Sequence, residues 1–313
     1  MHKILLIGST GKIGRHVLNE LFKNKHFDIR VLVRQHNDDR FSSYIGDILE
    51  RDSLRSGISW SDIVVNCAGI VSYKKKDQDI LHKINVDGTR NIVDICSSFN
   101  KLLVHTSSAV VYGSTKEQIN HKENLSHTNA YLSGYAISKL LADKIILDSP
   151  VKSLILRPST LISSHGSTFS KLLKLYRNGF VADLKGGASF ANPSDIAKAY
   201  SIAILNLLKQ ECQHEVYNLG GNNILISEVF EFFKKQEPRK TFYITNSVLN
   251  TLSFINDRFL LPVFNKSIIT RENFLTGNRF TYLDSTKAEN NLGYTVTSFF
   301  EAADNILNHV NHR

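Results

Sequence analysis

The stretch KILLIGSTGKIGRHVL, residues 3–18, decides the fold of this 313-residue chain. It starts with an apolar run, reaches glycine at positions 8, 11 and 14, and continues with apolar residues at helical spacing. A strand, a glycine turn and a helix in this order let the backbone approach a pyrophosphate, whose negative charge the helix N-terminus stabilises. This context favours a dinucleotide-binding loop over a glycine-rich turn that binds nothing.

The alternation of short apolar runs with amphipathic stretches continues through the first half of the chain. It predicts an α/β fold, a doubly wound parallel Rossmann sheet with helices on both faces. We expect about six strands, and the clearest lie at 4–7, 29–33, 63–66, 102–106 and 153–156. The clearest helices of this half are expected at 13–22, 81–96 and 135–147.

The rhythm becomes irregular after Pro158, which suggests a second region. We assign residues 1–158 to a dinucleotide-binding Rossmann domain and residues 159–313 mainly to a smaller, mostly helical, substrate-binding region. Segments near 190–220 are expected to return to the first domain. Because ligands of open α/β sheets bind at the carboxyl ends of the strands, the second region should cover that edge.

Composition and charge are those of a soluble globular protein. Hydrophobic residues make up 42% and charged residues 21%, and the formal net charge is +9. The lysines and arginines are spread along the chain, and their densest run is only Lys74 to Lys76. We interpret this as a solvated basic surface and expect no nucleic-acid partner, while a phosphorylated small molecule remains compatible with it.

Cysteine, histidine and hydropathy patterns exclude several other classes. Cys67, Cys96 and Cys212 are too scattered for a disulfide framework, and no CxxC or HExxH motif groups the histidines, so we expect a cytoplasmic protein with no structural metal. The first strand begins without a signal-peptide core before it. The apolar stretch 249–264 is broken by polar residues and Pro262, so we expect no integral membrane span. That stretch could still lie against a membrane or a hydrophobic substrate.

The end of the second predicted strand bears on the choice between NADP and NAD. An acidic residue there would accept hydrogen bonds from the ribose of NAD, but this chain has Val33 and Arg34. A guanidinium is suited to bind a 2′-phosphate, so NADP is the preferred cofactor, although Arg34 also fits an exposed strand-end cation. Lys12, in the glycine loop, either adds to phosphate binding or faces solvent.

Tyr135 and Lys139 are four residues apart in a predicted helix and therefore share one face. A phenol with a pKa of about 10 is a poor base at neutral pH, and an ammonium group one turn away is expected to lower that pKa. Thr106, Ser107 and Ser108 end a predicted strand, where a hydroxyl could hold the substrate oxygen. The set predicts proton transfer coupled to hydride transfer at a carbinol or carbonyl carbon.

Tyr112 and Lys116 have the same spacing as Tyr135 and Lys139. The residues between them are Gly, Ser and Thr, which favour a turn, so we do not expect a helix that would place both groups on one face. The acid/base role is therefore assigned to Tyr135.

These motifs resemble the extended short-chain dehydrogenase/reductase family, and within it the NAD-dependent epimerase/dehydratase group. The resemblance covers nearly the whole chain, because matching segments follow one another in order. They are residues 8–14, 46–48, 66–69, 85–89, 107–113, 135–139, 157–158, 284–288 and 292–294.

The resemblance implies a role for individual residues. Ser108 would polarise the substrate oxygen, Tyr135 would be the general acid or base, and Lys139 would bind the nicotinamide ribose. Asn85 would be structural, and His105 is interpreted as a buried histidine. The expected cofactor-binding residues are Gly8, Thr10, Gly11, Lys12, Ile13, Gly14, Arg34, Asp47, Ile48, Cys67, Ala68, Gly69, Tyr135, Lys139 and Pro158, with Asp47 and Ile48 at the adenine ring.

Three functions remain open at this point. An NADPH-linked ketone reductase, similar to dihydroflavonol reductases and hydroxysteroid dehydrogenases, is favoured by Arg34 and the apolar C-terminal region. A nucleotide-sugar epimerase or reductase with tightly held NAD(P) is the main alternative. A dehydratase is disfavoured because Ser107 and Ser108 replace the Asp-Glu pair of the 4,6-dehydratase branch.

The third function is a non-catalytic, dinucleotide-binding regulatory protein, which the intact Tyr135 and Lys139 pair disfavours. The expected partner is a small-molecule substrate. Many relatives form homodimers through two helices per subunit, so a homodimer is also a candidate state.

Overall fold

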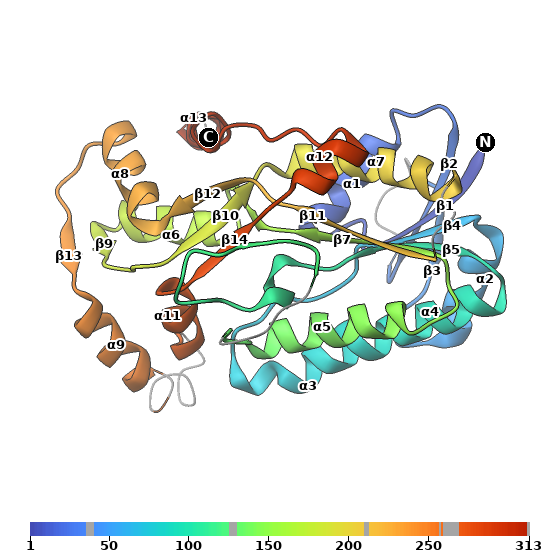
Figure 1. Cartoon of the computed structure of the whole chain (residues 1–313), viewed down its shortest axis with the longest axis horizontal. Helices are drawn as coiled ribbons and strands as arrows, with labels where there is room; N and C mark the ends of the chain where they lie inside the picture. Colours follow the sequence, from blue (N-terminus) through green and yellow to red (C-terminus); the bar gives the residue numbers. More distant parts are fainter. Residues whose placement is uncertain (36–40, 125–129, 210–212, 257, 259–268, 312–313) are drawn as a thin grey trace.

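The computed structural model describes residues 1–35, 41–124, 130–209, 213–256, 258 and 269–311. Its larger part is a seven-stranded sheet with the strand order β11-β7-β5-β4-β1-β2-β3, in which every neighbouring pair is parallel. Helices cover both faces of this sheet (Figure 1). The predicted doubly wound Rossmann sheet is therefore confirmed.

The elements of this sheet alternate along the chain as the sequence predicted. The strands are β1 (His2–Ile7), β2 (Phe27–Val33), β3 (Ser43–Ile45), β4 (Ile63–Asn66), β5 (Leu102–Thr106), β7 (Ser153–Pro158) and β11 (His214–Leu219). The covering helices are α1 (Lys12–Leu21), α2 (Arg51–Trp60), α3 (Gln78–Leu81), α4 (Gly88–Ser98), α5 (Gly134–Leu147), α7 (Pro193–Lys209) and α12 (Thr286–Leu292).

Two apolar layers hold the helices against the sheet. On one face, Val17 and Leu21 of α1 pack with Tyr200 and Leu207 of α7. On the other, α2, α4 and α5 bury a second set of aliphatic side chains, which includes Ile58. Strand β4 is buried along its whole length, as expected for a central parallel strand covered on both sides.

The five clearest strands predicted from the sequence are all present, but β3, β11 and helix α2 were not predicted. Strand β3 is a short, partly exposed edge strand, and β11 (HEVYNL) mixes polar with apolar residues. Helix α2 contains three serines and Gly57. These segments have a weak apolar period, and their pairing and packing within the fold determine their structure.

The remaining elements form the smaller region, which was expected to be mostly helical and also contains small sheets. Its largest core contains Phe169, Phe190, Phe233 and Phe299, all nearly or fully buried. Its helices are α6 (Thr168–Arg177), α8 (Ile226–Gln236), α9 (Asn246–Ile255), α11 (Arg271–Gly277) and α13 (Phe299–Asn311). The strands are β6 (Asn120–His121), β8 (Thr160–Leu161), β9 (Phe180–Ala182), β10 (Gly187–Ala191), β12 (Asn222–Leu225), β13 (Phe242–Ile244) and β14 (Phe280–Leu283).

The predicted helix at 81–96 is interrupted by a turn of π-helix. Residues His82–Asp87 (η2) form this turn between α3 and α4. Asn85 lies within it, and its side chain bonds both backbone groups of Ile70 and the Ser138 hydroxyl. It therefore joins the segment after β4 to α5, the structural role that the resemblance implied.

Membrane spans, metal clusters and disulfides are absent from the described ranges. None of the helices there is long and apolar enough to cross a bilayer. The same residues contain no group of three or more His, Cys, Asp or Glu side chains suited to hold a metal. Cys67 and Cys96 are free thiols, and Cys212 lies outside the described residues.

Candidate active site

The glycine loop turns tightly between β1 and α1. Gly8 has φ +81°, and the Gly11 amide donates to the Gly8 carbonyl at 3.0 Å. A Cβ on Gly14 would lie 2.0 Å from the Gly8 oxygen, so only glycine fits there. Gly11 precedes α1 as its N-cap and supplies no side-chain hydrogen bond, which leaves the first amides of the helix available to a phosphate. The loop thus fits the pyrophosphate of a dinucleotide.

The segment after β4 lies against this loop at the same edge of the sheet. A Cβ on Gly8 would meet the Ala68 nitrogen at 2.5 Å, and the Cys67 amide donates to the Ile7 carbonyl at 2.8 Å. Gly69 adjoins Asn85, because a Cβ on Gly69 would lie 3.1 Å from the Asn85 side-chain oxygen. The small residues therefore let the glycine loop, the segment after β4 and Asn85 approach one another closely at the edge where a cofactor would bind.

Three more predicted cofactor residues lie along this edge. Arg34 is exposed directly after β2. Asp47 follows β3, and its carboxylate accepts the Leu49 amide at 2.9 Å. The Ile48 side chain packs against Gly88 at the start of α4. Arg34 and Asp47 thus follow neighbouring strands, β2 and β3.

Lys12 reaches from the glycine loop to the substrate region. Its amine donates to the Gly166 carbonyl, in the loop before α6, and it also interacts electrostatically with Lys171 of α6. Burial lowers the pKa of Lys12. Neither of the two roles weighed from the sequence included this bridge between the two regions.

Tyr135 and Lys139 emerge from the first turns of α5, as their spacing predicted. The Ser133 hydroxyl caps the helix by accepting the Ala136 amide at 3.1 Å. Both side chains are almost completely buried, and the ring of Tyr73 packs edge-on against Tyr135 at 6.2 Å between centroids. The helix start thus positions both groups in the interior at the carboxyl end of the sheet.

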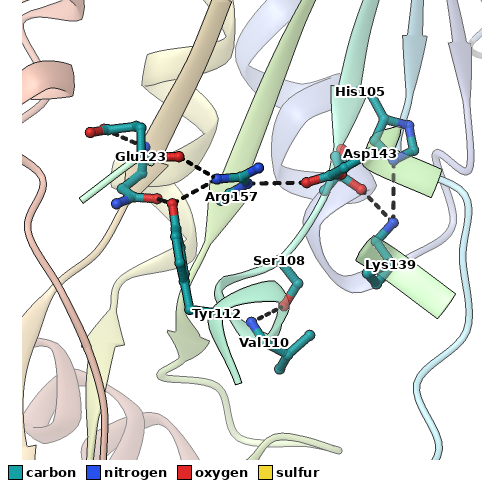
Figure 2. Close-up of polar contacts among 10 residues, drawn as sticks. His105, Ser108, Val110, Tyr112, Glu123, Lys139, Asp143 and Arg157 are labelled. Atoms are coloured by element: carbon teal, nitrogen blue, oxygen red, sulfur yellow. Dashed lines mark hydrogen bonds and ion pairs between the residues drawn. The ribbon is translucent and has the colours of Figure 1, made fainter. Parts of the chain in front are cut away.

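Ser108 lies just after β5 and faces Tyr135. Its hydroxyl interacts with the Tyr135 side chain and also accepts the Val110 amide at 3.4 Å (Figure 2). Ser107 is buried, and its hydroxyl faces Asp143 instead. The two neighbouring serines therefore point to different groups, and only Ser108 lies beside the tyrosine.

The pKa of Tyr135 differs from the sequence expectation. Burial raises it to about 12, the Ser108 hydrogen bond opposes this rise, and the Asp143 charge adds to it. Lys139 does not counter the rise as predicted, because its amine is turned to the Thr106 carbonyl at 2.7 Å. Burial lowers the pKa of Lys139 to about 8, although Asp143 opposes that change.

His105 contacts the Lys139 amine, a contact that the sequence did not predict. The Asn66 side-chain oxygen accepts the Ala68 amide at 3.0 Å, so its NH₂ group faces His105 Nδ1 at 3.2 Å. The proton of the neutral imidazole is then on Nε2, which lies 3.4 Å from Lys139 Nζ. Burial holds the pKa of His105 well below its usual value.

Arg157 joins the active-site helix to the strand β7. Its Nε lies 3.1 Å from Asp143 Oδ2, and its Nη1 donates to the Tyr112 hydroxyl at 2.8 Å and the Glu123 carbonyl at 2.9 Å (Figure 2). Tyr112 also donates to Asn218 at 2.6 Å. Tyr112 ends a short 3₁₀ turn, Ala109–Tyr112, and is fully buried. This supports its exclusion as the acid/base tyrosine.

Together, the glycine loop, the Tyr-x-x-x-Lys helix and the serine after β5 have the arrangement expected for a dinucleotide-binding site of the short-chain dehydrogenase/reductase type. The NAD dependent epimerase/dehydratase family matches residues 4–220. The chain belongs to this family.

Curated relatives of this chain include two kinds of oxidoreductase. A decarboxylating sterol-4-alpha-carboxylate 3-dehydrogenase of Schizosaccharomyces pombe is 30% identical over 164 residues, 49% of this chain and 47% of that protein. This chain thus spans about half the length of that relative. A dTDP-4-dehydrorhamnose reductase of Aggregatibacter actinomycetemcomitans is 25% identical over 231 residues, 71% of this chain and 74% of that protein.

A solved structure shows the same fold. UDP-glucuronic acid 4-epimerase from Bacillus cereus, in complex with UDP-glucuronic acid and NAD, has a TM-score of 0.74 and 20% identity. The alignment covers 98% of this chain and 99% of the epimerase.

Proposed function

We propose that this protein is an NADPH-linked reductase of a ketone, with Ser108, Tyr135 and Lys139 as its catalytic residues. The observation that carries the proposal is the convergence of these three side chains with the glycine loop at the carboxyl edge of one parallel sheet. Arg34 at the end of β2, in a place where NAD enzymes have a carboxylate, supports NADPH over NADH.

Each catalytic side chain has a task that its position supports. The Ser108 hydroxyl donates to the carbonyl oxygen of the substrate and so orients it beside Tyr135. Tyr135 gives its proton to that oxygen as negative charge develops on it, and a raised pKa keeps the phenol protonated for this step. Lys139 holds the nicotinamide ribose. The bound NADPH supplies the hydride.

The cofactor preference is tested by Arg34→Glu. A hydrogen bond to a charged group contributes roughly 1.5–3 kcal/mol, so the ratio of kcat/KM for NADPH to that for NADH should fall by about tenfold or more. Lys25→Glu is the control, because Lys25 lies just before the start of β2, at the opposite end from Arg34. This variant should leave the ratio unchanged. Rates are followed by absorbance of the reduced nicotinamide with a panel of ketones and keto-sugars. An unchanged ratio in Arg34→Glu would remove Arg34 from cofactor selection.

A nucleotide-sugar epimerase or reductase is the second candidate. The similarity to a dTDP-4-dehydrorhamnose reductase over 71% of this chain favours it. The contact of Lys12 with Gly166 also favours tightly held cofactor, since it closes the substrate region onto the glycine loop. An epimerase would convert a UDP-sugar without consuming added cofactor, and the same panel detects this.

We also propose that two copies pair through α4 and α5 in the cytoplasm. Ile137 and Leu141 are exposed one turn apart on α5, and Val93 and Ile145 line the groove between the two helices. A charge introduced at this exposed apolar pair would be buried on pairing, which is costly. Leu141→Glu should therefore convert a dimer into a monomer in light scattering, whereas Phe242→Glu on β13 should not. A monomeric wild type would contradict the pairing.

A further inference from the structure

Three charged side chains are buried together beneath the candidate active site. Lys139 and Asp143 come from α5, Arg157 comes from β7, and each is at most 3% exposed. Burial of a charge is costly unless another charge or hydrogen bonds compensate it. The contacts of each buried charged group therefore indicate its role.

Arg157 has its partners in a structural network. It bonds Asp143 Oδ2, the Tyr112 hydroxyl and the Glu123 carbonyl, and so ties β7 to α5 and to the segment after β5. These contacts use only one oxygen of the carboxylate. Asp143 Oδ1 is buried and has no hydrogen bond within normal distance to any part of the chain that the structure describes.

The second oxygen of Asp143 is not bonded by Arg157, and Asp143 lies on the same helix as Lys139. Asp143 follows Lys139 by four residues and thus lies on the same face of the helix, and the two interact electrostatically. Burial raises the pKa of Asp143, and the Arg157 charge and the Ser107 hydroxyl, which faces Asp143, both oppose that rise. Figure 2 shows the contact of Asp143 with Arg157.

Lys139 has few other groups that favour its ammonium form. The titratable groups around it are His105 of β5, Cys67 after β4, and Tyr135 and Asp143 of α5. Arg157 of β7 is paired with Asp143. Burial raises the pKa of Cys67 to about 12, so the thiol is uncharged at neutral pH. His105 presents its Nε2 proton. Only the Thr106 carbonyl and Asp143 then favour the cation among these neighbours.

We propose that Asp143 is a positioning residue, which keeps Lys139 cationic and directed at the Thr106 carbonyl, while Arg157 keeps Asp143 ionised. The inference rests on the proposed function for its catalytic meaning, because a reductase of this kind needs a cationic Lys139 to hold the ribose. The interactions of Arg157 with Asp143 and of Asp143 with Lys139 do not depend on which substrate is reduced.

The direct test is a pH titration of the Lys139 amine by NMR in protein with labelled lysine, assigned with Lys139→Met. An opposite charge within about 4–6 Å moves a pKa by about 1–3 units. In Asp143→Asn, Lys139 should therefore titrate about 1–3 pH units lower than in the wild type. The control is Asp148→Asn at the end of the same helix, where the carboxylate pairs with Lys144 at the surface, and it should cause no shift. Equal titration in Asp143→Asn and the wild type would overturn the proposal.

Two further measurements test the proposal if the Asp143→Asn variant does not fold. The double variant Asp143→Asn/Arg157→Gln leaves no unpaired buried guanidinium and should show the same downward shift. In the wild type, the Asp143 carboxylate should remain ionised. The chemical shift of its labelled carboxyl carbon should show a step at the pH where Lys139 titrates. A protonated Asp143 in that pH range would contradict the proposal without any substitution.

The pH dependence of kcat/KM distinguishes a positioning role of Asp143 from a purely structural one. Loss of the Asp143 charge should move the alkaline limb of kcat/KM to lower pH by the same 1–3 units or so, since Lys139 loses its proton earlier. A merely structural defect would lower kcat/KM equally at all pH values. Absence of reductase activity in the wild type would refute the proposed function but leave the NMR titration as the test of Asp143.

Discussion

Tyr135→Phe is expected to lower kcat by about 10²–10⁴-fold, the range that general acid catalysis contributes. The substitution removes the hydroxyl that gives its proton to the substrate oxygen, but it keeps the ring that packs against Tyr73. Dinucleotide affinity should stay within about twofold, because the glycine loop and Lys139 are unchanged. Single-turnover rates and cofactor titration by fluorescence measure the two effects separately.

Tyr112→Phe is the matched control for this substitution, since Tyr112 is the other tyrosine with a lysine four residues later. Its hydroxyl bonds Arg157 and Asn218, so its loss should reduce the free energy of unfolding by about 1–3 kcal/mol. Its kcat should stay within about tenfold of the wild type at a temperature where the protein is folded. Full activity in Tyr135→Phe, or a greater loss in Tyr112→Phe, would reverse the assignment.

Gly8→Ala is expected to abolish detectable dinucleotide binding. A methyl group at this position would lie 2.5 Å from the Ala68 nitrogen, and the residue also has a positive φ of 81°. The backbone of the glycine loop or of the segment after β4 must then move, which displaces the amides expected to bind the pyrophosphate. Isothermal titration with NADPH and NADH measures the loss.

Gly293→Ala separates the steric clash from the backbone strain. Gly293 has φ +56° at the end of α12, and a Cβ added there would meet no atom within 4 Å. This variant should lose about 1 kcal/mol of stability, as expected for a non-glycine residue in the left-handed region, and should keep its cofactor affinity. Unchanged binding in Gly8→Ala would show that the loop does not hold the pyrophosphate.

The sequence predicted those parts of the fold and site that depend on local pattern. The apolar run at 63–66 identified a central strand because β4 is buried along its length. The four-residue spacing placed Tyr135 and Lys139 on one helix face. By contrast, β11 depends on its pairing with β7, and its own residues give a weak strand pattern.

The electrostatics of the site could not be predicted in the same way. The spacing of Tyr135 and Lys139 suggested that the ammonium would lower the phenol pKa, but the direction of the amine depends on the Thr106 carbonyl, which another element supplies. The roles of His105 and Arg157 likewise depend on strands that the fold brings to α5. Asp143 did leave a sequence signal, since it follows Lys139 by one further helical turn.

The proposed reaction is net hydride transfer from NADPH to a substrate carbonyl, assisted by Tyr135. The measurement that tests it most directly uses NADPH with deuterium at the transferable position and analyses the product by mass spectrometry and NMR. We predict one deuterium on the new carbinol carbon for each NADPH oxidised, and loss of this transfer in Tyr135→Phe. Conversion of a nucleotide sugar to its epimer, with no deuterium incorporated and no NADPH consumed, would contradict the claim.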